Sequence, residues 1–166
     1  MEARKLHPPE TSPFHLSLRI RHPSLDPEEL SREFNIEAEH CFRAGDPRTS
    51  RSGIASVHPE SYWLGALDTA SWPSSEVSSP GTLRLLAGQA AQGGAGTRSL
   101  GWLLALSTRF LGAHANTLRR ITAENGQVSL LVTASSNAVG GFSLAPAVSR
   151  VFSELGITLE FEFPSD

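Results

Sequence analysis

The stretch that decides the fold is FHLSLRI, residues 14–20, followed shortly by LDPEELSREF, residues 25–34. In the first part apolar residues alternate with polar ones, which is the period of a strand with one buried face. In the second part Asp26 takes the N-cap position, Pro27 suits the first helical position and Glu29 falls at the capping-box position. The stretch therefore predicts a strand and then a short helix that ends near Asn35.

A similar order recurs near the end of the chain. VSLLV, residues 128–132, leads into LAPAVSRVF, residues 144–152, and then into an alternating stretch. These patterns predict a strand over 127–134, a helix over 146–155 and a strand over 157–163. The second copy has Ala145 where the first has Asp26, with Ser143 as a substitute cap. We interpret the repeat as a duplicated scaffold or as convergence on one local structure.

The middle of the chain adds two strands and one long helix. A strand is predicted over 38–43, with His40 and Phe42 on one side and Cys41 and Arg43 on the other. A turn-rich loop over 44–53, a strand over 62–67 and a helix over 99–124 follow. This order predicts an α+β two-layer sandwich, with a mainly antiparallel sheet and helices on one face, related to the ferredoxin-like arrangement.

Composition bounds the organisation of the chain. The 166 residues suit a single domain over 14–166, after a flexible leader over 1–13. A Gly-, Ser- and Pro-rich stretch at 73–97 predicts a surface insertion. With 39% hydrophobic and 19% charged residues, the chain has enough apolar material for a core and too little charge for disorder. No stretch has the length of a signal peptide or membrane span, so we expect a soluble, cytoplasmic protein.

Charge and spacing argue against several functions. The net charge of −3 lacks the electrostatic footprint of a nucleic-acid-binding protein. The six histidines show none of the short spacings of metal sites, so no metal or cofactor is expected. Cys41 would be a nucleophile only beside a histidine in an electropositive setting, and a buried, unreactive core cysteine is the expected role. No catalytic residues are predicted.

The loop over 43–53 and the aromatic pair after it are the predicted recognition site. The predicted partner-binding residues are arginines and an aspartate in the loop, then two aromatic residues: Arg43, Asp46, Arg48, Arg51, Tyr62 and Trp63. Arginine and aromatic side chains are typical of protein-binding hot spots, and loops on a rigid scaffold often carry function. The structural alternative is that residues 45–47 form only a tight turn and that Trp63 only fills the core.

Several of these motifs resemble a bacterial family named domain of unknown function 4279. The resemblance rests on FHLSLRI, on residues 25–30 and 42–46, on the pair Tyr62-Trp63 and on the closing segment 144–163. It implies a small bacterial α+β domain with no assigned catalytic activity. Some members resemble immunity or accessory proteins found beside toxins.

Two functions follow as hypotheses. The first is a non-enzymatic protein-binding domain, immunity-like or accessory, whose partner is another protein such as a toxin encoded nearby. The alternative is a small-molecule-binding or enzymatic domain with a pocket between sheet and helices. A third, weaker reading is a homodimer that pairs through exposed strand edges.

Overall fold

A computed structural model describes residues 13–49, 53, 55–68, 100–135 and 144–162. The predicted insertion at 73–97 and all but the last residue of the predicted leader lie outside the described residues.

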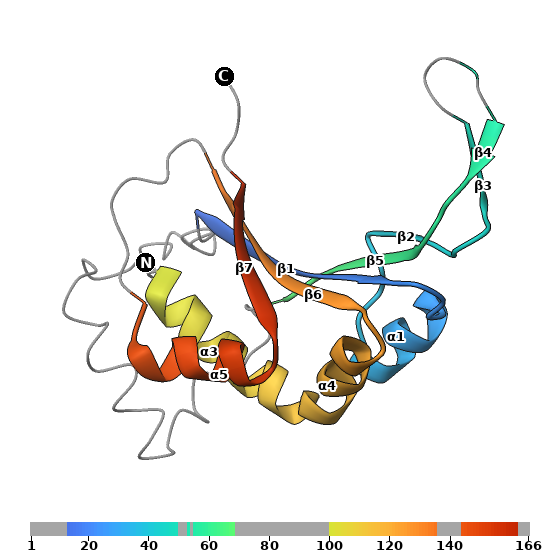
Figure 1. The fold of residues 1–166 in the computed structure, drawn as a ribbon. Coiled ribbons are helices and arrows are strands. Elements are labelled where there is room, and N and C mark those ends of the chain that lie inside the picture. Colours follow the sequence, from blue (N-terminus) through green and yellow to red (C-terminus); the bar gives the residue numbers. More distant parts are fainter. Residues whose placement is uncertain (1–12, 50–52, 54, 69–99, 136–143, 163–166) are drawn as a thin grey trace, which may run out of the picture.

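A five-stranded sheet forms one layer of the molecule, in the order β2-β5-β1-β6-β7 (Figure 1). Its strands are β1 (Phe14–His22), β2 (His40–Phe42), β5 (Ser61–Ala66), β6 (Gln127–Ala134) and β7 (Ile157–Glu162). Neighbouring strands are antiparallel except β6 and β7, which are parallel. The first strand of the chain therefore lies at the centre of the sheet.

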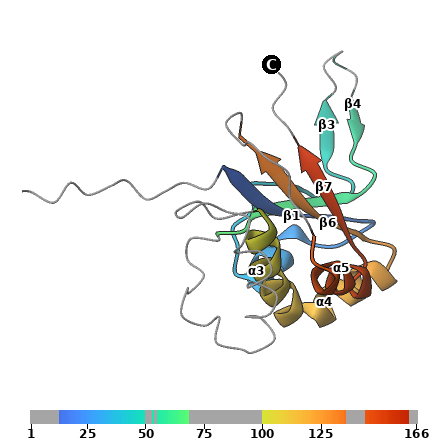
Figure 2. The ribbon, with the colours of Figure 1, turned by 90° about the vertical axis from the view of Figure 1, so that its left-hand side faces the viewer.

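The helices form the second layer, on one face of the sheet (Figure 2). They are α1 (Pro27–Phe34), α3 (Leu100–Ala113), α4 (Ala115–Ala123) and α5 (Pro146–Glu154). This arrangement confirms the predicted α+β sandwich with a mainly antiparallel sheet and helices on one side. The other face of the sheet carries no helix among the described residues; we call it the open face.

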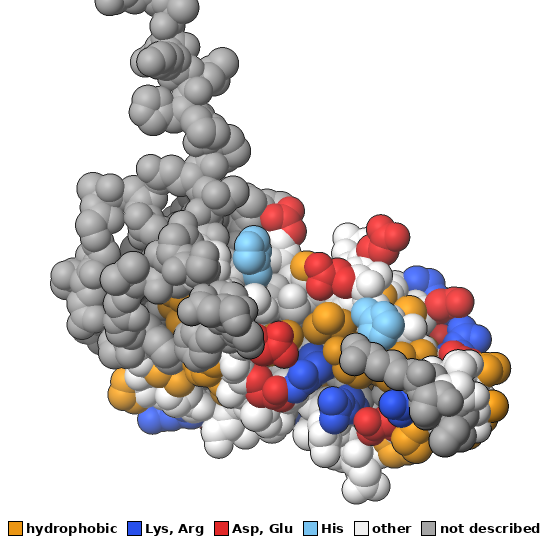
Figure 3. Space-filling model, turned by 90° about the horizontal axis from the view of Figure 1, so that it is seen from above, with side chains coloured by type: hydrophobic (Ala, Val, Ile, Leu, Met, Phe, Trp, Pro, Cys, Tyr) orange, Lys and Arg blue, Asp and Glu red, His pale blue; other side chains and the backbone are white. Residues whose placement is uncertain are grey.

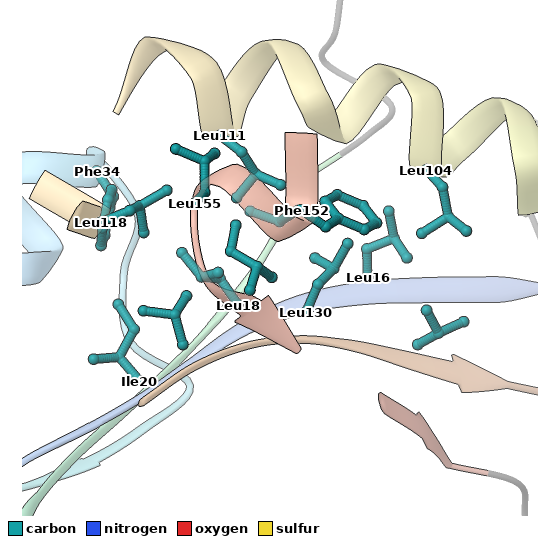
Figure 4. Close-up of a cluster of buried hydrophobic side chains, with 14 of the residues drawn as sticks. Leu16, Leu18, Ile20, Phe34, Leu104, Leu111, Leu118, Leu130, Phe152 and Leu155 are labelled. Atoms are coloured by element: carbon teal, nitrogen blue, oxygen red, sulfur yellow. The ribbon is translucent and has the colours of Figure 1, made fainter. Parts of the chain in front are cut away.

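The core lies between the two layers (Figure 4). The alternation of residues 14–20 predicted one buried face for this strand, and the structure confirms it: Leu16, Leu18 and Ile20 are each at most 2% exposed. Leu118 and Leu130, from α4 and β6, are fully buried against them. Burial of this apolar surface is the main force that holds the helices to the sheet.

The cap predicted for the first helix is present. The carboxylate of Asp26 accepts a hydrogen bond from the Glu28 backbone N–H at 2.9 Å, and Pro27 begins α1. Asn35 ends the helix in the left-handed conformation, with a φ of 52°. At α5 the N-cap is Ala145, which makes no side-chain cap hydrogen bond.

The prediction of one long helix over 99–124 is wrong in one respect. The structure divides this segment into two helices, α3 and α4, at His114. The backbone of His114 leaves helical geometry, with φ −105° and ψ 19°. Gly112, a poor helix former, lies just before the break, and the His114 ring packs edge-on to Phe34 at 5.0 Å. The change of direction lets α4 bury Leu118 and Ile121 completely.

Part of the predicted loop over 44–53 is also ordered differently. It contains a strand, β3 (Pro47–Thr49), which pairs with β4 (Ala55–Val57) in a separate two-stranded sheet. All six strand residues are exposed. The sequence therefore has no alternation of apolar and polar residues that would predict these two strands.

The two similar sequence patterns enter the sheet differently. In the second, β6 and β7 are parallel neighbours joined through α5. In the first, the strand after α1 is β2, and β5 lies between it and β1. The likeness is therefore one of local structure and does not extend to topology. None of the described helices is long and apolar enough to cross a membrane.

Candidate partner-binding surface

Tyr62 and Trp63, predicted together as recognition residues, lie on opposite faces of β5. Trp63 points into the helix layer and is 1% exposed. Its indole Nε1–H donates to Ser31 Oγ at 2.9 Å, and its ring lies 5.5 Å from that of Phe34. Trp63 therefore fills the core, which is the structural alternative left open by the sequence, and it is not available to a partner.

Tyr62 belongs instead to a group of four aromatic rings on the open face, at the β2–β5 edge of the sheet. We call His40, Phe42, His58 and Tyr62 the aromatic ladder. Phe42 stacks on His58 at 3.7 Å and on Tyr62 at 5.2 Å between ring centroids. His40 meets Phe42 and Tyr62 edge-on, at 5.8 and 5.7 Å. His40 is exposed and the other three are half-buried, so the ladder is accessible along its length.

The sheet register builds this ladder. Phe42 lies directly opposite Tyr62, and His40 opposite Leu64, in the antiparallel β2–β5 pair. Cross-strand neighbours on one face are close enough for their rings to pack. The prediction that His40 and Phe42 share one side of their strand agrees with this register. Figure 3 looks on to the open face, where hydrophobic side chains lie among acidic and basic ones.

Arg21 is the basic residue next to the ladder. It lies opposite Tyr62 in the β1–β5 register. Its side chain is 45% exposed, and its Nε is 3.9 Å from Glu60 Oε1, at the outer limit of an ion pair. An exposed pair of this length contributes little to stability, so both side chains are free to contact a partner.

Arg43, in contrast, is occupied within the fold. Its guanidinium lies 2.9 Å from Asp26 Oδ1 and 3.2 Å from Glu28 Oε1, at the start of α1. The Glu28 backbone N–H, together with Arg43, holds the pKa of Asp26 below its usual value. The hydrogen bond to Asp26 in turn raises the pKa of Arg43. Arg43 therefore ties the loop after β2 to the first helix.

Asp46 shapes the base of the β3–β4 hairpin. Its carboxylate accepts a hydrogen bond from the Arg43 backbone N–H at 2.7 Å. Its carbonyl accepts from His58 N–H at 3.0 Å, while Gly45 N–H donates to the His58 carbonyl at 2.8 Å. Asp46 thus acts as a turn residue. Arg48 is exposed on β3, and Arg51 lies outside the described residues.

The other half of the open face is closed by an ion pair. Arg19, on β1, reaches across β6 to bond Glu160 on β7. Hydrogen bonds from Ser129 and then from Arg19 lower the pKa of Glu160. Ser129 and Leu131, on the intervening strand, are only 7% and 6% exposed. The aromatic ladder therefore lies on the part of the open face that this ion pair leaves uncovered.

Among the described residues no three His, Cys, Asp or Glu side chains gather as a metal site. The hollow between sheet and α1, lined by Ile20, Leu30 and Trp63 among others, has no room for a water molecule. A groove of about 350 Å³ opens beside the end of α1, lined by Phe34, Phe110 and neighbouring residues.

Cys41 is exposed, so the expectation of a buried cysteine is wrong. It shares the helix side of the sheet with Trp63, its partner in the register. Helix α1 packs on β5, and β2 is the edge strand beyond it, so the side chain of Cys41 is left uncovered.

The comparisons with known proteins add no relative: no family model matches the chain, and neither a curated protein nor a solved structure matches it significantly. The resemblance to the domain of unknown function 4279 family therefore stays a prediction.

The sequence predicts Tyr62 as a recognition residue, but it does not indicate the ladder as a unit. It places His40 and Phe42 on one strand face without giving them a role. The contribution of His58 depends on the fold-back of the hairpin, which brings residue 58 beside residue 42, and no spacing in the sequence reports that contact.

Proposed function

We propose that this chain is a non-enzymatic protein-binding domain whose partner docks on the aromatic ladder. The observation that carries the proposal is the stack of Phe42 between His58 and Tyr62 on the open face, which none of the described helices covers. Aromatic rings offer large contact area at a low cost in conformational entropy, and they dominate binding hot spots.

The charges around the ladder support the same function. Arg21 lies beside Tyr62 with only a long contact to Glu60, so it can pair with a partner without breaking a strong internal bond. Arginine beside aromatic rings is the composition in which interface energy concentrates. The loop residues Arg43 and Asp46 fix the backbone that follows Phe42, through the Arg43–Asp26 ion pair and the hydrogen bond from Arg43 N–H to the Asp46 carboxylate.

The finer proposal is an immunity-like or accessory role, with a toxin encoded nearby as the partner. It is supported by the net charge of −3, which would favour a basic partner surface. The small-molecule alternative would use the groove of about 350 Å³ beside the end of α1, because the hollow between the sheet and α1 itself is filled by side chains.

The test is binding to the purified product of each adjacent gene, measured by calorimetry. Phe42→Ala and Tyr62→Ala should each weaken binding by at least about tenfold, the effect of a hot-spot residue. Thr158→Ala, an exposed position on β7 at the far edge of the open face, is the matched control and should bind like the wild type. Circular dichroism would confirm that all variants fold.

Two results would count against the proposal. If both aromatic variants bound a partner as tightly as the wild type, the ladder would not be the interface. If no adjacent gene product bound the wild-type chain, the immunity-like role would lose its support.

A further inference from the structure

The groove beside the end of α1 combines an apolar wall with an acidic rim. Its volume of about 350 Å³ lies in the lower part of the range of small-molecule sites. The apolar residues that line it are Phe34, Ile36, Leu67 and Phe110. Its rim carries the carboxylates of Glu37 and Asp68, and none of the residues that line the groove is basic. The groove therefore offers apolar contact and negative charge to one ligand.

Backbone hydrogen bonds fix both sides of the groove. On one side Asn35 turns the chain at the end of α1 in the left-handed conformation, with a φ of 52°. Ile36 N–H then donates to the Ser31 carbonyl at 3.1 Å, which holds the segment that follows α1. On the other side Leu67 N–H donates to the Leu16 carbonyl at 2.8 Å. The groove is therefore formed before a ligand arrives, and preorganisation lowers the cost of binding.

The electrostatics of the groove favour a positively charged ligand. Glu37 is exposed, and within the described part of the chain it belongs to no ion pair. Asp68 adds a second carboxylate to the rim. Helix α1 also ends at the groove, with Phe34 as its last residue, and cations are favoured near the C-terminus of a helix. An anion in the same place would meet two charges of its own sign.

From these observations we propose that the groove binds a small organic amine whose apolar part carries a ring. The protonated amine pairs with Glu37, in a charge-assisted hydrogen bond. The ring covers Ile36 and Phe110, the two half-buried residues of the apolar wall. This inference goes beyond the proposed protein-binding function, and it gives the small-molecule alternative a class of ligand.

A basic side chain of a protein partner is a poorer occupant of the groove. Two residues of its wall belong to the helix layer, since Phe34 ends α1 and Phe110 lies on α3. The aromatic ladder lies on the open face, which is the other side of the sheet. A partner that docks on the ladder therefore leaves the groove uncovered. The proposed ligand is accordingly a free amine, and a lysine side chain becomes an outcome of the test.

The test is a titration of the uniformly ¹⁵N-labelled full chain with phenethylamine, followed by two-dimensional NMR. A salt concentration of about 0.15 M screens charges that are distant from the groove. Phenethyl alcohol and hydrocinnamate have a similar shape without the positive charge, and lysine blocked at both ends represents a peptide side chain. We expect saturable shifts of the amides of residues 35–37 and 67–68 with phenethylamine. The alcohol should bind at least about threefold more weakly, and hydrocinnamate should cause no shifts there.

Two glutamine variants separate the rim of the groove from the charge of the chain as a whole. Glu37→Gln keeps the shape of the side chain and removes its charge, so it should weaken the binding of phenethylamine by at least about threefold. Glu39→Gln is the matched control, because Glu39 is also exposed but does not line the groove. It should bind phenethylamine like the wild type.

Several results would overturn the inference. They are absence of shifts at the groove, binding of the alcohol or of hydrocinnamate as tight as that of the amine, and equal affinities of the two glutamine variants. Tighter binding of the blocked lysine than of phenethylamine would also overturn it, in favour of a peptide side chain. Failure here is distinct from failure of the proposed function, because the variants of Phe42 and Tyr62 test the ladder on the other side of the sheet.

Discussion

Gly65 is the position where a single methyl group should test the packing described above. Gly65 lies on β5, two residues after Trp63 and on the same face, with the indole ring lying across it. A Cβ added at Gly65 would press on Trp63 Cη2, stand 2.7 Å from Trp63 Cζ2 and 2.8 Å from Ile36 Cγ2. Carbon atoms pack favourably at about 3.5–4.0 Å, so the ring would have to retreat by roughly 1 Å.

That retreat is costly because the indole is held at both ends. Nε1–H donates to Ser31 Oγ at 2.9 Å, and the ring packs against Phe34. Overpacking costs about 1–3 kcal/mol, and a weakened hydrogen bond adds about 1 kcal/mol. Alanine in a strand recovers about 0.5–1 kcal/mol of the backbone entropy that glycine loses. We therefore expect Gly65→Ala to lower the free energy of unfolding by about 2 kcal/mol.

Urea unfolding followed by tryptophan fluorescence and circular dichroism would measure this change. The matched control is Gly112→Ala, because that exposed helical glycine has no atom within 4 Å of an added Cβ. There alanine should be neutral or should stabilise by up to about 1 kcal/mol. If Gly65→Ala unfolded at the wild-type urea concentration while the control behaved as expected, the packing of Trp63 across Gly65 would be refuted.

Three further predictions concern the polar contacts of the fold. Ser31→Ala should lower the free energy of unfolding by about 1 kcal/mol and change the emission of Trp63, whereas unchanged emission would contradict the hydrogen bond between them. Glu160 has a folded-state pKa below its ordinary value, so its bonds stabilise the fold above that ordinary value and are lost as the pH falls through the folded-state pKa. Urea midpoints at neutral and acidic pH should therefore show a shallower acid loss for Glu160→Gln than for the wild type, and an equal loss would contradict the pairing with Arg19. Asp26→Asn keeps a good capping side chain and loses the charge, while Asp26→Ala loses both, so thermal unfolding should place the alanine variant lower, and equal values would argue against the cap.

The sequence predicts well the parts of the fold whose signals are local. Asp26 and Pro27 start α1, and Asn35 ends it, because capping depends on neighbours in the chain. The alternation over 14–20 likewise indicates the buried face of β1 without knowledge of the rest. In each case the physical cause lies within a few residues of its effect.

Other features could not be predicted because their causes are distant in sequence. The bond of Arg19 to Glu160 joins residues 141 positions apart, so neither residue signals the other. The division of the long helix at His114 accompanies packing against Phe34, which is brought there by the tertiary fold. The strands of the β3–β4 hairpin show no alternation of apolar and polar residues in the sequence, because all of their residues are exposed.

The asymmetry of the open face decides where a partner can bind. Toward β7, the Arg19–Glu160 pair spans β6. Leu131 on β6 is already buried, at 6% exposure, so a partner there would gain little apolar contact. Toward β2, the strand is only three residues long, and in the described part of the chain the long Arg21–Glu60 contact is the ion pair beside its rings, so Phe42 stays accessible between Tyr62 and His58. Because His58 also forms the base of the β3–β4 hairpin, the ring stack joins the sheet to the hairpin. A partner that contacts the stack would therefore also contact the residue that anchors the hairpin.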